Sequence, residues 1–249
     1  MQIASHLVSQ IAANELTDGH VPSELDITQQ FGVSRVVARE TLKILSALDI
    51  VHIAQGRRVM LRPPEEWDYL SPLLLEWLPA DGVTDLLREF QETRLLLEPE
   101  LAARAATMIT KASLRRLGEL VDQMVELEDR PDDYLEVDHA FHMEICRASQ
   151  NRILDRIMYS SRWLLATSRR VTNEEPDGLS AATSIHRRIL AAIGSGDPEA
   201  ARQVMRTHME LNVEILGKAK RAGAGRTGSA RGRKGRTKGQ TERQAESSA

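Results

Sequence analysis

The sequence contains one cysteine, Cys146, and only nine aromatic residues among its 249 residues. A single cysteine excludes an intramolecular disulfide framework and a zinc site built from several cysteines, so a reducing compartment is expected. The small number of aromatic residues argues against an aromatic-rich β-sandwich and against a base-stacking platform. These absences favour an all-α plan.

The sequence also lacks a long apolar run and a recognisable targeting segment. No run approaches the roughly 20 apolar residues that a membrane span needs, and residues 1–16 lack the basic start of a secretory signal. We therefore expect a cytoplasmic protein with no membrane partner. A chain of 249 residues with 41% apolar residues suits one large or two modest globular domains.

The net charge of −3 is the sum of three opposed segments. Residues 217–249 hold 10 Lys/Arg and 2 Glu, residues 63–216 hold 17 basic and 28 acidic residues, and residues 1–62 hold six of each. Residues 32–62 carry all six of those basic residues against two acidic ones. This asymmetry indicates a polyanion as the partner of the basic segments and a separate task for the acidic middle.

Residues 1–62 have the pattern of a winged helix-turn-helix domain. Helical spacing of apolar residues predicts a helix near 3–14, a second through Phe31 and a third after Ser34, with Gly32 as the break between the last two. Two short strands, 50–53 and 59–61, are expected around a turn at 55–58. The mainly α plan therefore includes one small β-hairpin wing.

Pro63 and Pro64 begin an expected linker over residues 63–82, because proline interrupts both helices and ladders. Helices are then predicted near 83–108, 112–129, 132–149, 151–171, 180–194 and 198–216. Short connections between them predict a six-helix antiparallel bundle over residues 83–216.

Residues 217–249 are rich in Gly, Arg, Lys, Ser and Thr, which predicts a disordered basic tail. This tail is either a solvated extension or a source of salt-dependent attraction to DNA phosphates.

The basic residues of the third helix and the hairpin turn are candidates for DNA contact. Arg35 and Arg39 share one helix face, where each could make a bidentate contact to guanine, and Ser34 at the helix N-terminus suits a phosphate. A solvated basic face is the alternative interpretation. The candidate DNA-binding residues are Ser34, Arg35, Arg39, Lys43, Arg57 and Arg58.

This region resembles the N-terminal domain of the GntR family of bacterial transcription regulators. The resemblance rests on Pro22-Ser23-Glu24, the stretch 31–35, the stretch 39–42 and the Gly/Arg turn after Ile50-Val51. It implies that residues matching Ser34, Arg35 and Arg39 contact double-stranded operator DNA. The sequence departs from the family pattern at Leu25, at Val36-Val37 and at Arg58, so an operator sequence cannot be transferred from relatives.

Four residues of the acidic middle have side chains typical of a metal site. Asp138 and His142 lie four residues apart on an otherwise apolar helix face, and His186 and His208 each lie within an apolar helical stripe. One carboxylate and three imidazoles suit a divalent transition metal, with zinc first and nickel or manganese as alternatives. Hydrogen-bonded core histidines are the other interpretation.

Residues of about 85–216 resemble the FCD effector domain found in the FadR-type branch of that family. The resemblance rests on the Asp138 and His142 pair, Asn151, the stretch 186–190 and Gly196-Asp197 leading to His208. The resemblance implies that the residues matching Asp138, His142, His186 and His208 bind the metal. It also implies a small carboxylate effector that completes the coordination.

Arg94 lies in a stripe of apolar residues and is the candidate ligand-binding residue. Its guanidinium is either a bidentate clamp on the effector carboxylate or half of an internal pair with Glu98. In the linker, Trp67, Tyr69 and Trp77 are similar to residues of relatives that sense sugar acids, or they serve only to dock domains.

These features predict a ligand-responsive transcription regulator, in this family most often a repressor, that binds a pseudo-palindromic operator as a homodimer. A metal-dependent hydrolytic enzyme and an architectural DNA-binding protein are the alternatives. We expect no enzymatic activity, because the sequence contains no HExxH, GxSxG or phosphate-binding glycine loop.

Overall fold

The computed structural model describes residues 1–16, 20–54, 59–172 and 178–234, and of residues 169–172, 216 and 218–234 it describes the backbone alone. The chain divides into two compact units, one formed by Met1–Phe90 with Arg152–Thr167 and the other by Gln91–Asn151 with the chain from Ser168 onward. Among the described helices, none has both the length and the apolar character needed to cross a membrane.

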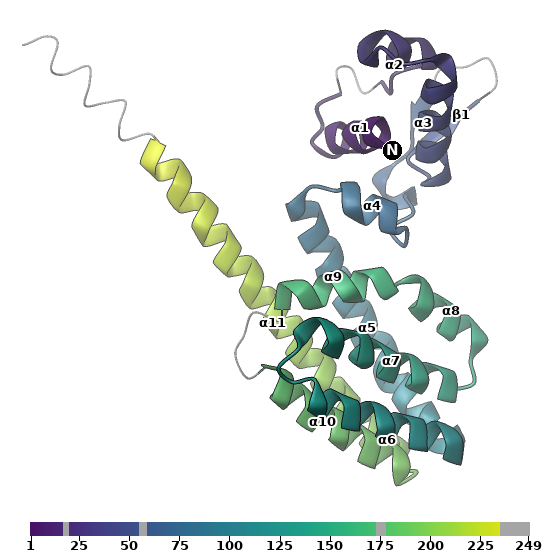
Figure 1. The fold of residues 1–249 in the computed structure, drawn as a ribbon, viewed down its shortest axis with the longest axis vertical. Helices are drawn as coiled ribbons and strands as arrows, with labels where there is room; N and C mark the ends of the chain where they lie inside the picture. The colour runs from purple at the N-terminus through teal and green to yellow at the C-terminus, as the bar shows by residue number, and fades with distance from the viewer. Residues whose placement is uncertain (17–19, 55–58, 173–177, 235–249) are drawn as a thin grey trace, which may run out of the picture. The chain divides into compact units, whose positions relative to one another are not determined.

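The N-terminal part of the first unit is a helix-turn-helix followed by a two-stranded antiparallel hairpin (Figure 1). Val51 pairs with Leu61 and Ile53 with Val59 across the hairpin. The expected turn at 55–58, which includes Arg57 and Arg58, lies outside the described residues. The elements are α1 (Gln2–Ala12), α2 (Glu24–Phe31), α3 (Arg35–Ala47), β1 (Val51–Ile53) and β2 (Val59–Leu61).

Local chemistry fixes the junction between α2 and α3. Ser23 and Asp26 form a capping box, in which the Ser23 hydroxyl accepts from the Asp26 amide and the Asp26 carboxylate accepts from the Ser23 amide. Gly32 ends α2 at φ 63°, a left-handed conformation that glycine adopts without steric strain. The Ser34 hydroxyl then accepts from the Val37 amide and starts α3. The predicted helix-turn-helix is therefore confirmed.

The segment after the hairpin packs into the core of the first unit. It contains a 3-10 turn (Pro64–Glu66) and α4 (Pro72–Trp77), and Trp67, Leu74 and Trp77 are buried there with residues of α1 and α3. The Trp67 indole N–H donates to the Arg62 carbonyl at 3.1 Å. These contacts make Trp67 and Trp77 part of the core of the first unit.

The remaining chain is helical, as the sequence predicts. Helices α6, α7 and α10 lie side by side, and α10 also packs on α11 (Figure 1). The elements are α5 (Ala80–Met108), α6 (Lys111–Glu126), α7 (Pro131–Ala148), α8 (Arg152–Ser160), α9 (Arg162–Thr172), α10 (Gly178–Gly194) and α11 (Pro198–Lys234). The carboxylate of Asp197 caps α11 by accepting from the amides of Glu199 and Ala200, as the Asp-Pro pair predicts.

Two helix boundaries differ from the sequence prediction. The helix expected over 151–171 is divided at Ser161, whose hydroxyl donates to the Met158 carbonyl, a local bond that competes with helix continuation. Helix α11 continues to Lys234, into the segment for which composition predicts disorder. Extending an existing helix through Ala, Arg and Lys needs no new nucleus, which favours this continuation. Residues 235–249 lie outside the described residues.

Contacts between helices set the directions in the second unit. Helix α11 runs opposite to α5, because Arg202 pairs with Glu100 while the Cβ position of Gly196 lies 3.8 Å from the Ala106 carbonyl. Helix α7 runs in the same direction as α5, because Glu98 contacts His142 and Arg104 donates to the Ser149 carbonyl. Side chains of α5, α7 and α11, which are distant in sequence, thereby lie at the same height along the helix axes.

Candidate functional site

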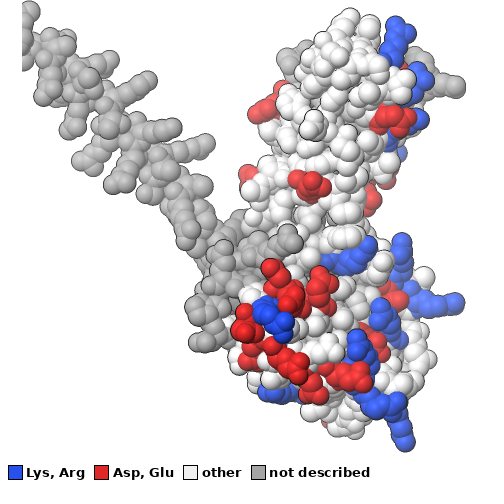
Figure 2. Space-filling view, viewed as in Figure 1, with Lys and Arg blue, Asp and Glu red and all other residues white. Residues whose placement is uncertain are grey.

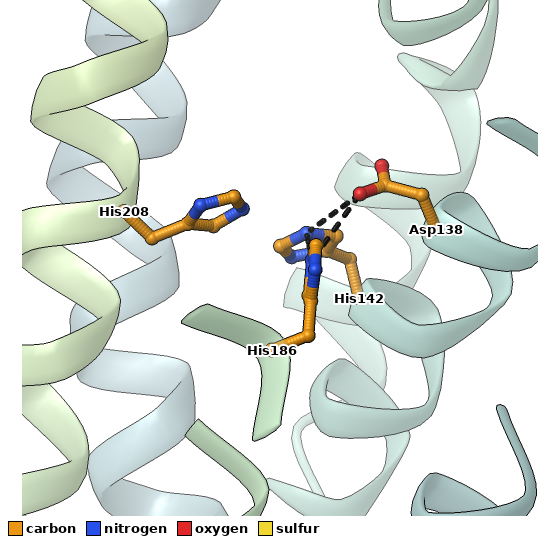
Figure 3. Close-up of side chains that lie close together, drawn as sticks. All are labelled: Asp138, His142, His186 and His208. Atoms are coloured by element: carbon orange, nitrogen blue, oxygen red, sulfur yellow. Dashed lines mark hydrogen bonds and ion pairs between the residues drawn. The ribbon is translucent and has the colours of Figure 1, made fainter. Parts of the chain in front are cut away.

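The four predicted metal ligands meet inside the second unit. Helix α7 supplies Asp138 and His142, α10 supplies His186 and α11 supplies His208 (Figure 3). One ligand atom from each lies within 4.8 Å of the others, and all four residues are buried. Their exposed fractions are 0%, 4%, 0% and 2% in that order.

The distances between the donor atoms fit one small cation. The Nε2 atom of His186 lies 3.2 Å from Asp138 Oδ1 and 3.3 Å from His142 Nε2, and His142 Nε2 lies 3.8 Å from the same Oδ1. Tetrahedral ligands bound at about 2.0–2.1 Å are separated by about 3.4 Å. The arrangement thus needs only small adjustments to hold an ion between these atoms.

Glu98 of α5 is the residue that orients His142. Its Oε2 lies 2.5 Å from Nδ1 of His142, so this nitrogen carries the proton and Nε2 faces Asp138 and His186. Burial alone would raise the pKa of Glu98, but the nearby Arg94 and His142 lower it to about 2, so the side chain is a carboxylate. Sequence reasoning named Glu98 only as a possible partner of Arg94.

Arg94 is fully buried on α5 and forms the internal pair that the sequence left as one of two interpretations. Its Nε lies 2.5 Å from Glu98 Oε1, and one terminal nitrogen donates to the Gln91 side-chain carbonyl at 3.4 Å. The Gln91 amide donates to the Ser168 hydroxyl at 2.9 Å. A polar chain therefore leads from the histidine cluster through Glu98 and Arg94 to Ser168.

Aromatic residues of α7 form the surroundings of the cluster. The Phe141 ring meets the His186 ring edge-on, with the two centroids 4.9 Å apart. Tyr134, one helical turn before Asp138, has its hydroxyl 3.2 Å from that of Thr183. This packing fixes α10 against α7 and holds His186 at the level of Asp138.

The predicted DNA-contacting residues of α3 lie on the surface of the first unit. Figure 2 shows Lys and Arg side chains along the edge of this unit where α3 lies. Arg39 donates two hydrogen bonds to Glu24 of α2, at 2.9 and 3.3 Å, and Lys43 pairs with Glu40 at 2.8 Å. The salt bridge with Glu24 holds the Arg39 guanidinium against α2. Arg57 and Arg58, which the sequence predicts to lie in a turn, are outside the described residues.

Comparison with protein families matches most of the chain. The model described as "Bacterial regulatory proteins, gntR family" matches residues 1–61, and the model of the FCD domain matches residues 89–211. The second match contains the four residues of the histidine cluster together with Arg94 and Glu98.

Individual proteins show the same similarity. The HTH-type transcriptional regulator YieP of Escherichia coli K12 is 33% identical over 158 residues, which cover 61% of this chain and 68% of that protein. The galactonate operon transcriptional repressor of the same strain is 24% identical over 218 residues, 86% of this chain and 95% of the repressor.

One solved structure extends the comparison to the fold. Lar, described as controlling expression of the Listeria monocytogenes agr system, aligns with 87% of this chain and 96% of its own, at a TM-score of 0.60 and 16% identity. At this identity the likeness concerns the fold alone.

Proposed function

This chain belongs to the GntR family of bacterial regulatory proteins and carries an FCD domain, and from this premise we propose how it works. It is a ligand-responsive transcription regulator that binds DNA. In our proposal it acts as a homodimeric repressor, with residues 1–62 as the DNA-binding domain, 63–82 as a linker, 83–216 as the sensing domain and 217–249 as a basic tail. The regulator works in the cytoplasm and associates with the nucleoid when bound to DNA.

The observation that carries the proposal is the buried cluster of Asp138, His142, His186 and His208 in a chain that also has a helix-turn-helix. Three imidazoles and one carboxylate suit a divalent transition metal, and an ion that accepts five or six donors would keep positions open for a ligand beside these four. The bound ion would supply positive charge and these open positions to a carboxylate. Nickel and manganese remain the alternatives to zinc.

Arg94 supplies the second half of effector recognition in this proposal. Its guanidinium has no exposed surface; its Nε lies 2.5 Å from Glu98 Oε1, and one terminal nitrogen donates to Gln91 at 3.4 Å. A guanidinium carries five N–H donors in a planar fork, the geometry that pairs with a carboxylate, and this one lies beside the histidine cluster through Glu98. We propose a small organic or sugar acid as the effector, a class consistent with the name of the galactonate operon repressor.

On the DNA side, α3 enters the major groove with Arg35 and Arg39 toward base edges and Ser34 toward a phosphate. Lys43 adds a phosphate contact, and Arg57 and Arg58 would contact the backbone from the wing. One recognition helix covers too few base pairs for selectivity, so a two-fold symmetric dimer is expected.

Fluorescence anisotropy tests the proposal with labelled duplexes from the region upstream of the chain's own gene. The zinc-loaded protein should bind one such duplex and discriminate it from a scrambled duplex of equal length. A panel of organic and sugar acids should contain at least one that changes this affinity about fivefold or more, a typical allosteric coupling. Absence of selective binding would contradict the proposal that the protein is a transcription regulator. Selective binding that no acid changes would favour an architectural DNA-binding protein.

A further inference from the structure

Asn212 of α11 has a buried amide that is not one of the ligand groups of the histidine cluster. It is 8% exposed, and within the described part of the chain its Nδ2 has no hydrogen-bond partner. It follows His208 by four residues, so both side chains lie on one helix face, one turn apart. A buried donor without a partner is costly and is seldom kept unless something else satisfies it.

Other buried polar residues lie at the same level as Asn212. Gln91 lies about one turn before Arg94 on α5, and Tyr134 lies about one turn before Asp138 on α7. Because α7 runs in the same direction as α5 and α11 runs in the opposite direction, these two turns correspond in height to the turn of α11 that follows His208. Thr183 joins this level through its contact with Tyr134. Gln91, Tyr134, Thr183 and Asn212 form what we name the polar layer, one helical turn from the metal cluster, and all four are at most 8% exposed.

The hydrogen bonds within the polar layer single out Asn212. The Thr183 hydroxyl donates to the Leu179 carbonyl and lies 3.2 Å from the Tyr134 hydroxyl. Gln91 uses its carbonyl for Arg94 and its amide for Ser168. Among the side-chain donors of the polar layer, the amide of Asn212 is the one that these hydrogen bonds do not use.

We propose that Asn212 binds a hydroxyl group of the effector and that the effector is therefore a polyhydroxylated acid. This inference rests on the proposed function, since it takes the effector carboxylate to lie at the metal cluster and Arg94. A hydroxyl both donates and accepts, so it satisfies an amide nitrogen and also pairs with the amide oxygen.

The separation of the two levels sets the size of the acid. One helical turn is about 5.4 Å, and carbon–carbon bonds are about 1.5 Å long. A hexonate such as D-galactonate or D-gluconate spans this distance, with its carboxylate at the cluster and a distal hydroxyl in the polar layer. Glycolate, with a single carbon beyond its carboxylate, binds at the cluster and does not reach Asn212.

Isothermal titration calorimetry on the full-length zinc-loaded protein tests this with D-galactonate, D-gluconate and glycolate as probes. One of the hexonates should bind more tightly than glycolate. Asn212→Ala should weaken hexonate binding about three- to tenfold, the size of one hydrogen bond, and leave glycolate binding unchanged. Gln203→Ala, which removes an exposed amide from the same helix, should change neither affinity. Zinc content and the thermal midpoint establish that each variant is folded and loaded.

The outcomes separate this inference from the proposed function. Equal losses for hexonate and glycolate in Asn212→Ala, or hexonate affinity that does not change, would overturn the role of Asn212. A lower thermal midpoint of Asn212→Ala without any change in hexonate affinity would indicate that the amide binds a buried water, and this result would also overturn the role of Asn212. If no acid binds the zinc-loaded protein while selective DNA binding persists, the proposed effector site itself fails.

Discussion

Glu98 Oε2 lies 2.5 Å from Nδ1 of His142. This contact directs the Nε2 lone pair of His142 toward Asp138 and His186, and it links the cluster to the Arg94 side chain that pairs with the other oxygen of Glu98. The imidazole is thus held in one tautomer and one orientation before any ion arrives. Carboxylates that orient metal-binding histidines in this way contribute strongly to metal affinity.

Glu98→Gln is therefore predicted to weaken metal binding although it removes no ligand. The amide no longer enforces protonation at Nδ1 of His142, and we expect the affinity for Zn²⁺ to fall about 10- to 100-fold. Competition with a chromogenic chelator measures this affinity. Glu92→Gln, an exposed position on the same helix, serves as the matched control. Unchanged affinity in Glu98→Gln would mean that the contact does not position His142 for a metal.

Removal of the metal is predicted to destabilise the second unit. An ion that binds the native state at 100 times its dissociation constant contributes about 2.7 kcal/mol to unfolding free energy. A chelator should accordingly lower the thermal midpoint of the wild-type protein, and added Zn²⁺ should restore it. In His186→Ala the midpoint should no longer respond to either treatment, whereas the exposed control His52→Ala should respond as the wild type does. An equal chelator response in both variants would argue against the site.

Sequence reasoning predicts the local structure better than it predicts the contacts around the cluster. Ser23, Gly32 and Ser34 act through bonds to neighbouring residues, so the limits of α2 and α3 can be predicted from the sequence. Asp138 and His142 are also local, since four-residue spacing places them on one helix face.

The rest of the site depends on how whole helices are placed along one another. His186 and His208 reach Asp138 and His142 because α10 and α11 are placed at the matching position along α7. The apolar stripes predicted that each histidine faces the interior and suggested a shared metal site, and the family resemblance implied the same four ligands. The contact between Glu98 and His142 joins residues 44 positions apart and depends on the stagger of α5 and α7. Apolar periodicity says which face of a helix is buried and does not say which residues of another helix it meets.

Arg39→Ala is predicted to remove operator selectivity. Glu24 holds the Arg39 guanidinium by two hydrogen bonds, a bidentate arrangement that fixes it beside α2. Loss of one bidentate base contact costs about 1–3 kcal/mol of discrimination, so the preference for operator over scrambled DNA should fall about 5- to 150-fold in fluorescence anisotropy.

Two further variants test the same contact. Glu24→Gln keeps the arginine but loosens its support and should give a smaller loss. Arg116→Ala, an exposed arginine of α6, should leave the preference intact. Retained selectivity in Arg39→Ala would contradict its place at a base edge.

Truncation of the basic segment is predicted to weaken sequence-independent DNA binding through loss of phosphate contacts. Residues 217–234 hold seven Lys/Arg and no acidic residue, whereas residues 235–249 hold three Lys/Arg and two Glu. A chain ending at residue 234 should therefore behave nearly as the full chain does, and one ending at residue 216 should bind scrambled DNA more weakly. Each lost phosphate contact reduces the slope of log affinity against log salt by about 0.9, so a fall of about 2 or more between the two truncations is expected. Equal slopes would show that these seven charges do not meet DNA.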